Sequence, residues 1–231
     1  MSKRISKKMQ EALKKVDKDK FYDLPEAIKL VKEVSISSFP GSVDLSFNLN
    51  LDTRKAEQQL RGAISLPNGT GKVVKVLATT DDTKQQEAAK KAGADIIANK
   101  VDLEEILKSG KFNFDVIVTD PKMMPILGKY GKALGPKGLM PNPKTGTVTP
   151  NLGKTIEEIK KGKANYRTDK EGIINASIGK TSMDDKKLLE NAKTLIDTII
   201  KLKPSTVKGK YILNLTLSPT MGPSVKINLT I

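Results

Sequence analysis

The two ends of the chain alternate apolar and polar residues with the period of a half-buried β-strand. Between 43 and 51 the apolar residues Val43, Leu45, Phe47, Leu49 and Leu51 alternate strictly with polar ones. The alternation returns with Tyr211, Leu213, Leu215 and Leu217, and again with Val225, Ile227, Leu229 and Ile231. Such patterns are typical of antiparallel or mixed sheets with one buried face.

Helices and a hairpin are expected beside these strands. Apolar residues at helical spacing predict helices over 6–16, 24–34 and 184–201. The apolar spacing of the first helix begins with Ile5. The second helix carries start signals: Asp23 can cap it, Pro25 fits its first turn, and Glu26 completes a capping-box pattern. Residues 164–168 and 173–179 are interpreted as a hairpin around the turn 169–172.

The middle of the chain follows a different pattern. Short apolar strands are expected at 72–79, 94–98 and 115–120, followed by helices at 83–92, near 102–109 and from Pro121 onward. Alternating strands and helices favour parallel βαβ units. We therefore expect a two-layer α+β domain built from both chain ends (1–66 plus 160–231). It is interrupted by an inserted, Rossmann-like three-layer α/β domain (67–159).

Net charge separates these expected domains. The chain carries a net charge of +15, of which the two-piece domain holds +12 and the insert +3. A strongly basic balance favours nucleic acid first and an anionic membrane second, with a solvated lysine surface as the plain alternative. Cysteine and histidine are both absent, which removes thiolate metal sites and the commonest general base and weakens any enzyme hypothesis. We expect no cofactor.

No apolar run approaches the ~20 residues of a membrane span. The basic N-terminus lacks the apolar core of a signal peptide. These features favour a cytoplasmic protein without membrane partners.

Residues 121–156 contain six lysines and no carboxylate. A positive, turn-rich loop with exposed backbone amides suits a polyanion. Because this stretch belongs to the insert, we interpret Lys132, Lys137 and Lys144 as a secondary nucleic-acid surface.

Two other motifs have simpler explanations than ligand binding. The NGTGK stretch at 68–72 lacks the spacing of a phosphate-binding loop and precedes its strand, so a hinge is the better interpretation. Asp81, Asp82 and Asp120 follow predicted strands, and without a partner histidine or phosphate loop they are expected to be helix caps.

Two connectors carry residues suited to RNA. Phe39 lies in a polar segment (35–42), where its ring could either stack on a nucleotide or anchor the loop. The segment 218–224 joins two strands and holds Thr220, Met221 and Gly222, which together suit recognition of sugar edges. Phosphate contacts beside this turn are expected from Lys163, Arg167, Lys208 and Lys210.

The run LGPKGLMPNPKTGTVT at 134–149 closely resembles the bacterial large-subunit ribosomal proteins of the L-one family. RGAISLPNGTGK (61–72), YRTDKEGIINASIGK (166–180) and TMGPS (220–224) resemble the same family, in the expected order along essentially the whole chain. The resemblance implies a split RNA-gripping domain and an inserted α/β domain joined by a hinge. The RNA-contact positions that it implies are Glu26, Phe39, Arg167, Thr220, Met221 and Gly222. The chain departs from the family pattern beside these positions, at Ser38, Thr168 and Pro219.

The resemblance also implies a role. A non-enzymatic protein of the large ribosomal subunit is expected, located on the cytoplasmic ribosome in its mobile stalk and monomeric when free. It would bind a hairpin of the large-subunit rRNA, assist release of deacylated tRNA from the exit site, and repress translation of its own mRNA. The rival hypotheses are an enzyme that binds a nucleotide or sugar phosphate in the α/β insert and a polybasic protein of membrane surfaces.

Overall fold

The computed structural model describes residues 6–17, 19–110 and 112–228. In this part of the chain, α-helices and β-strands are mixed and the strands form three sheets. The chain divides into two compact units, with boundaries between Gly71 and Lys72 and between Lys163 and Ala164. We call the unit formed by both chain ends unit 1 and the middle one unit 2. Ile5, Leu229 and Ile231, which the predictions included, lie outside the described residues.

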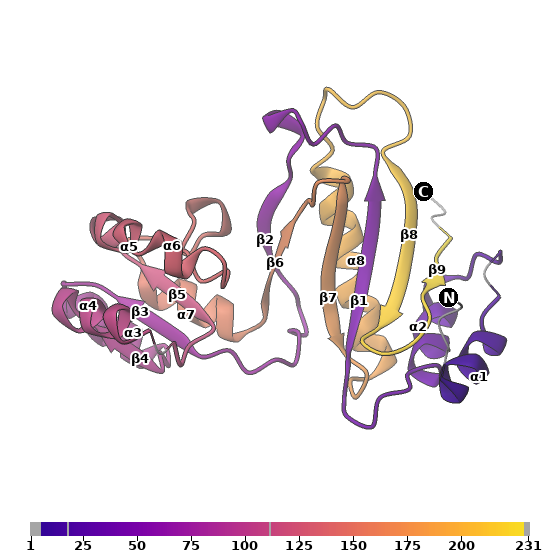
Figure 1. Cartoon of the computed structure of the whole chain (residues 1–231), viewed down its shortest axis with the longest axis horizontal. Helices are drawn as coiled ribbons and strands as arrows, with labels where there is room; N and C mark the ends of the chain where they lie inside the picture. Colours follow the sequence, from indigo (N-terminus) through magenta and orange to yellow (C-terminus); the bar gives the residue numbers. More distant parts are fainter. Residues whose placement is uncertain (1–5, 18, 111, 229–231) are drawn as a thin grey trace. The chain divides into compact units, whose positions relative to one another are not determined.

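Unit 1 is built around a four-stranded sheet in the order β7-β1-β8-β9, seen with its helices in Figure 1. Its strands are β1 (Ser42–Leu49), β7 (Ile173–Lys180), β8 (Ile212–Pro219) and β9 (Val225–Lys226), and its helices are α1 (Lys7–Lys15), α2 (Leu24–Glu33) and α8 (Asp185–Lys201). The pairings between these strands are antiparallel, which is one of the two arrangements that the alternation favours.

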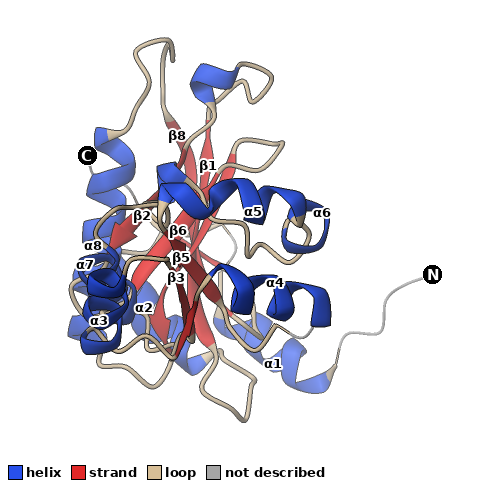
Figure 2. Ribbon diagram, turned by 90° about the vertical axis from the view of Figure 1, so that its left-hand side faces the viewer, coloured by secondary structure: helices blue, strands red, loops and turns tan. Residues whose placement is uncertain are grey.

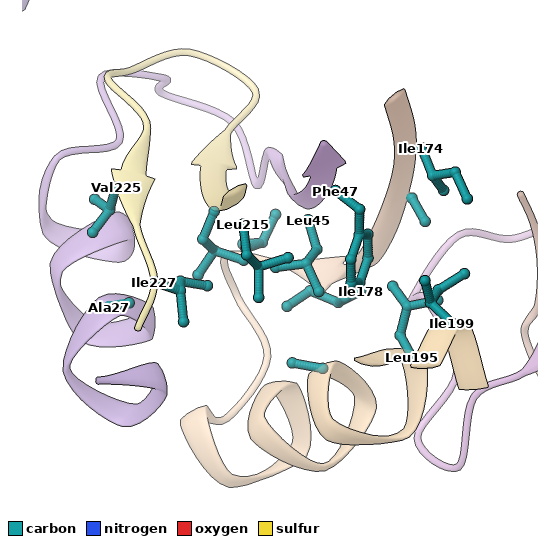
Figure 3. Close-up of a cluster of buried hydrophobic side chains, with 14 of the residues drawn as sticks. Ala27, Leu45, Phe47, Ile174, Ile178, Leu195, Ile199, Leu215, Val225 and Ile227 are labelled. Carbon is teal, nitrogen blue, oxygen red and sulfur yellow. The ribbon is translucent and has the colours of Figure 1, made fainter. Parts of the chain in front are cut away.

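One face of this sheet packs against α2 and α8 to form the core of unit 1. Leu45, Phe47 and Leu215 from the strands meet Leu195 and Ile199 from α8, and all five are buried (Figure 3). The alternate residues of the strands lie on the opposite face of the sheet, because successive side chains of a strand point to opposite sides.

The predicted hairpin at 164–179 is wrong in its strand pairing. The turn exists, since the Asp169 amide donates to the Ile173 carbonyl (2.9 Å). However, β6 (Lys163–Arg167) pairs with β2 (Arg61–Ser65) in a separate two-stranded sheet, while β7 pairs with β1. Among the described residues, the two arms of the predicted hairpin are paired with each other by a single β-bridge, between Thr168 and Ile174.

Strand β2 was not predicted because a glycine interrupts its short pattern. Gly62 is required there by close packing: a Cβ at this position would lie 2.4 Å from the hydroxyl oxygen of Tyr166 on the partner strand β6. The glycine that interrupts the sequence pattern of β2 is therefore the residue that allows β2 to pair with β6.

Leu213 does not point into the core, although the alternation placed it there. The pairing of β1 with β8 shifts between Asn48 and Leu49, whose partners are Asn214 and Ile212. This bulge leaves Leu213 as the extra residue. Ile212 is buried in its place, and Leu213 is 49% exposed.

The capping box predicted for α2 is also wrong. Asp23 occupies the N-cap position, but its side chain accepts no cap hydrogen bond. In a capping box this side chain would accept from the amide of the third helical residue, Glu26. The second residue, Pro25, has no N–H to offer as an alternative.

Unit 2 contains a parallel sheet in the order β4-β3-β5. Its strands are β3 (Val76–Thr79), β4 (Ile96–Ala98) and β5 (Val116–Thr119). Its helices are α3 (Thr83–Lys91), α4 (Lys100–Ser109), α5 (Met124–Lys129), α6 (Gly131–Leu134) and α7 (Leu152–Lys160). The helix expected from Pro121 begins as a 3₁₀ turn, η2 (Pro121–Met123), before α5. Two further 3₁₀ turns are η1 (Ala56–Gln58) in unit 1 and η3 (Pro143–Thr145) in unit 2.

Helices cover both faces of the unit 2 sheet (Figure 2). Leu77 of β3 belongs to a buried cluster that includes residues of α4, α5 and α6. Its neighbours Val76 and Ala78 belong to a second cluster with residues of α3 and α7. Alternate residues of one strand thus enter different cores, so the strands read as continuous apolar runs.

A buried asparagine holds the connector that leaves unit 1. The Asn191 side chain, fully buried on α8, donates to the carbonyls of Gly69 (2.8 Å) and Ile178 (2.7 Å) and accepts from the amide of Asn68 (3.1 Å). Gly69 and Gly71 both have positive φ angles, which glycine adopts readily. The segment up to Gly69 is therefore anchored to unit 1.

Candidate nucleic-acid interface

Hydrogen bonds join the two connectors that carry Phe39 and Met221. The amide and the Oγ1 of Thr220 donate to the Ser42 carbonyl (2.9 and 3.2 Å), and the Ser42 amide donates to Thr220 Oγ1 (2.7 Å). The Ile36 amide donates to the Met221 carbonyl (2.9 Å). Segments that are about 180 residues apart in the sequence therefore form one surface, which we call the 39/221 patch: residues 35–42 and 218–222.

Two glycines allow this close approach. A Cβ at Gly222, whose φ is +157°, would lie 2.7 Å from both the Val34 carbonyl oxygen and Pro219 Cγ. A Cβ at Gly41 would lie 3.2 Å from Thr220 Oγ1. The backbone of the turn at Gly222 is thus pressed against the segment that follows α2.

The apolar side chains of the patch remain in solvent. Phe39 and Met221 are each 56% exposed. The Phe39 carbonyl accepts from Ser37 Oγ (2.9 Å), which fixes the backbone of the loop rather than its ring. Two large apolar groups exposed on one constrained surface can mark a binding site, and an aromatic ring and a methionine suit base or ribose faces. This geometry favours the stacking alternative for Phe39 over that of a loop anchor.

A cation missed in the sequence lies at the same end of the sheet. Lys180 is the β7 partner of Ser42, so Ser42 is flanked by Lys180 on one side and by Thr220 on the other. The next residue, Thr181, donates its amide to the Gly41 carbonyl (2.8 Å). Lys180 is identified by the pairing of β1 with β7, and the sequence alone does not reveal that pairing.

From the patch, a polar face extends along the sheet. Asp44, Ser46 and Asn48 of β1 lie on the face opposite the core, and the cross-strand partners of Ser46 are Asn175 and Thr216. These side chains are exposed or half-buried. Hydroxyl and amide groups in rows can contact sugars and bases through hydrogen bonds. Their signal was present in the sequence as the polar half of the alternation.

One carboxylate lies on this polar face. Burial raises the pKa of Asp44 above its ordinary value of 3.8, and a hydrogen bond with Ser177 offsets part of that shift. A raised pKa means that the folded state holds the proton more tightly than the unfolded chain does. The ionised carboxylate therefore costs stability, and the cost appears as the pH rises through the pKa of the folded state.

We expect Asp44→Asn to raise the melting temperature at pH 7, and the gain to shrink toward zero below about pH 3.8, where both states are protonated. The same change should tighten RNA binding, because it removes a negative charge from the polar face. Thermal unfolding across pH checks the first effect. Asp197→Asn on the exposed side of α8 makes the same charge change as a control, and an equal gain there would contradict the role of burial.

Arg167, Lys208 and Lys210 do not lie beside the 39/221 patch, so that prediction is wrong. Thr220 bonds to Ser42 at one end of β1, whereas the carbonyl of Tyr211, which follows Lys210, accepts from Asn50 just beyond the other end. Seven residues of strand separate these ends, roughly 20 Å at about 3.3 Å per residue. Arg167 lines a cleft of about 390 Å³ with Thr53 and Lys170, at the same distant end.

Lys163 and Glu26 are placed differently again. Lys163 belongs to unit 2, where its Nζ lies 3.2 Å from a carboxylate oxygen of Glu158 and its side chain is 15% exposed. Its charge is therefore already paired. Glu26 is exposed in the first turn of α2, eight residues before Val34 and thus roughly 12 Å along the helix from the patch.

The three lysines of the predicted secondary surface are exposed in unit 2. Lys132 lies on α6 and Lys144 in η3. Lys137 Nζ is 4.2 Å from the centre of the Phe112 ring, a cation–π geometry that holds it at the surface.

Acidic residues at the ends of the unit 2 strands act as the sequence predicts. Asp82 and Asp120 accept hydrogen bonds from the amides of Lys84 and Lys122, two residues further on. The Asp81 carboxylate accepts from the Lys100 amide (3.2 Å) at the start of α4. Among the described residues no cluster of acids could hold a metal ion, and no helix is long and apolar enough to cross a membrane.

The structural boundary changes the distribution of charge. Lys160, Lys161 and Lys163 fall in unit 2 rather than unit 1, so the net charges become +9 for unit 1 and +6 for unit 2. Charge alone therefore does not single out unit 1 as the docking unit. The exposed 39/221 patch, rather than net charge, is what distinguishes unit 1 as the candidate RNA-binding unit.

Comparison with known proteins gives one family. Residues 7–223 match the model of the ribosomal protein L1p/L10e family. The "Large ribosomal subunit protein uL1" of Mycoplasma mobile is 67% identical over 99% of both chains. The proteins of the same name from Mycoplasmopsis pulmonis and Metamycoplasma arthritidis are 66% and 60% identical, over 98% and 99% of this chain and 99% and 100% of theirs. The chain belongs to the ribosomal protein L1p/L10e family.

Proposed function

We propose that this chain is a structural, non-enzymatic protein of the large ribosomal subunit that binds an rRNA hairpin through unit 1. The names of its relatives and the family match support the ribosomal assignment. The observation that carries the RNA site is the joining of two distant connectors so that Phe39 and Met221 stand exposed on one fixed surface.

The RNA would lie along the strands of the unit 1 sheet. The 39/221 patch contacts ribose and base faces at one end, and the polar face supplies hydroxyl and amide groups next to it. Arg167, Lys208 and Lys210 meet phosphates roughly 20 Å away at the other end. Contacts spread in this way recognise the shape of a folded RNA rather than a run of bases.

Two further roles rest on the family resemblance. Unit 2 assists release of deacylated tRNA from the exit site, with Lys132, Lys137 and Lys144 facing the nucleic acid. Unit 1 represses translation of its own mRNA by binding a similar RNA element there. If one surface serves both RNAs, an excess of the rRNA hairpin should displace the mRNA leader from the protein.

The hairpin-binding role predicts unequal effects of two matched phenylalanine changes. Phe39 and Phe21 are both 56% exposed, but Phe21 stacks near Lys226, outside the 39/221 patch. Phe39→Ala should weaken binding of the large-subunit rRNA hairpin about tenfold or more, as expected for loss of one stacked base. Phe21→Ala should leave the affinity unchanged in the same filter-binding assay.

Two results would argue against this function. Equal affinities for the two variants would remove Phe39 from the interface. A wild-type protein that binds rRNA no better than an unrelated RNA of equal length would remove hairpin recognition altogether.

A further inference from the structure

The N-terminal helix borders the 39/221 patch. A groove of about 320 Å³ separates α1 from the segment that follows α2. Helices α1 and α2 lie side by side in Figure 1. Lys8, Ala12 and Lys15 line it from α1, and Val34, Ser35 and Ile36 line it from the other side.

This groove is continuous with the patch through shared backbone. The amide of Ile36 donates to the Met221 carbonyl, and the Val34 carbonyl is the atom against which Gly222 packs. The wall of the groove is thus the same segment that supports the Thr220–Gly222 turn. A strand of RNA in contact with Met221 would have the groove as its next surface.

The charges in the groove are not used by the fold. Lys8 and Lys15 are exposed and form no ion pair with another described residue. Both lysines follow the same side of α1, because seven residues make almost two helical turns. They are spaced about 10 Å along the helix axis, at 1.5 Å per residue, and can contact separate phosphates.

We infer that α1 is a second wall of the RNA interface, with Lys8 and Lys15 binding phosphates of the strand that leaves the 39/221 patch. This rests on the proposed function. Glu11 and Glu33 also line the groove. Glu11 lies between the two lysines on the same face of α1, and Glu33 lines the opposite side. Both carboxylates can accept hydrogen bonds from ribose 2′-hydroxyls, while Lys8 and Lys15 bind the phosphates on either side of Glu11.

A matched pair of double variants tests this inference in the full-length protein. Lys8→Ala with Lys15→Ala removes the two groove lysines. Lys7→Ala with Lys14→Ala removes the same charge from the same helix, from positions turned by about 100° around its axis. Affinity for the rRNA hairpin is measured between ~50 and ~200 mM salt.

The groove variant should bind about tenfold more weakly at low salt. The slope of its plot of log affinity against log salt should be smaller in magnitude by about two, which corresponds to the loss of two phosphate contacts. The control should keep the wild-type slope. Equal effects of the two variants would overturn the inference. If the wild-type protein itself fails to bind the hairpin selectively, the proposed function fails instead, so the two failures are distinguishable.

Discussion

Met221→Asp is expected to lower the affinity for the rRNA hairpin roughly 100-fold or more. The methionine is 56% exposed at the turn that hydrogen bonds fix against Ile36 and Ser42. In the proposed complex its replacement removes the burial of an apolar side chain against a sugar or base face, worth about 1.5–3 kcal/mol. It also places a negative charge where the proposed interface would bring phosphates close. Filter binding of the full-length variant measures the loss.

The fold should survive this change, because the side chain contributes little to the core. Val101→Asp is the matched control: it adds the same charge at a residue 67% exposed, in the first turn of α4 in unit 2. Circular dichroism should be unchanged for both variants. Undiminished affinity of Met221→Asp, or an equal loss for Val101→Asp, would exclude the turn from the interface.

Asn191→Leu should destabilise unit 1 by roughly 3 kcal/mol or more. The change leaves three backbone groups, at Asn68, Gly69 and Ile178, without the partner that they have in the fold. A buried group that loses its partner costs about 1–3 kcal/mol; the bond to Ile178 is buried and the other two are partly buried, so they add smaller costs. Hydrogen exchange should rise over α8 and over residues 66–71, and thermal unfolding should begin at a lower temperature.

An exposed asparagine provides the comparison. Asn48→Leu makes the same chemical change on the outer face of β1, where no such network is broken. Its melting temperature should stay close to that of the wild type. Wild-type stability of Asn191→Leu would show that the network does not anchor the connector.

The main helices and strands could be predicted from the sequence because their patterns are local. Strict alternation at 43–49 gives β1, and helical spacing at 184–201 gives α8 within a residue of its observed start. The pairing of strands is not local. The turn at 169–172 suggested a hairpin, but β6 finds its partner in β2, more than 90 residues away in the sequence.

Single-residue details failed for identifiable physical reasons. A bulge between Asn48 and Leu49 turns Leu213 out of the core, and no residue pattern announces it. Pro25 removes one of the two amides that Asp23 could cap, and the bond to the other, at Glu26, is not formed. Strand alternation and helix capping are general rules. Whether Leu213 is buried depends on a register shift, and whether Asp23 caps α2 depends on the bonds its side chain actually forms.

The candidate site was predicted in part. Phe39 and the Thr220–Gly222 turn stood out as exposed residues in polar connectors, and the fold joins them. Arg167 and Lys208 were grouped with them by charge, and Arg167 also by the family resemblance, whereas the length of β1 keeps both apart from the patch. Lys180 became visible only through its register opposite Ser42. Proximity across a sheet depends on pairing, which charge and composition do not encode.

Site-directed crosslinking in assembled ribosomes tests most directly whether the 39/221 patch is the RNA contact. The chain contains no cysteine, so a photoactivatable group attached to a single introduced thiol marks one position. Ser38→Cys places it beside Phe39, and Lys193→Cys places it on the exposed side of α8, which covers the opposite face of the sheet. Strong crosslinks to large-subunit rRNA from Ser38→Cys and few or none from Lys193→Cys are expected. Crosslinks from Lys193→Cys that equal or exceed those from Ser38→Cys would contradict the proposed interface.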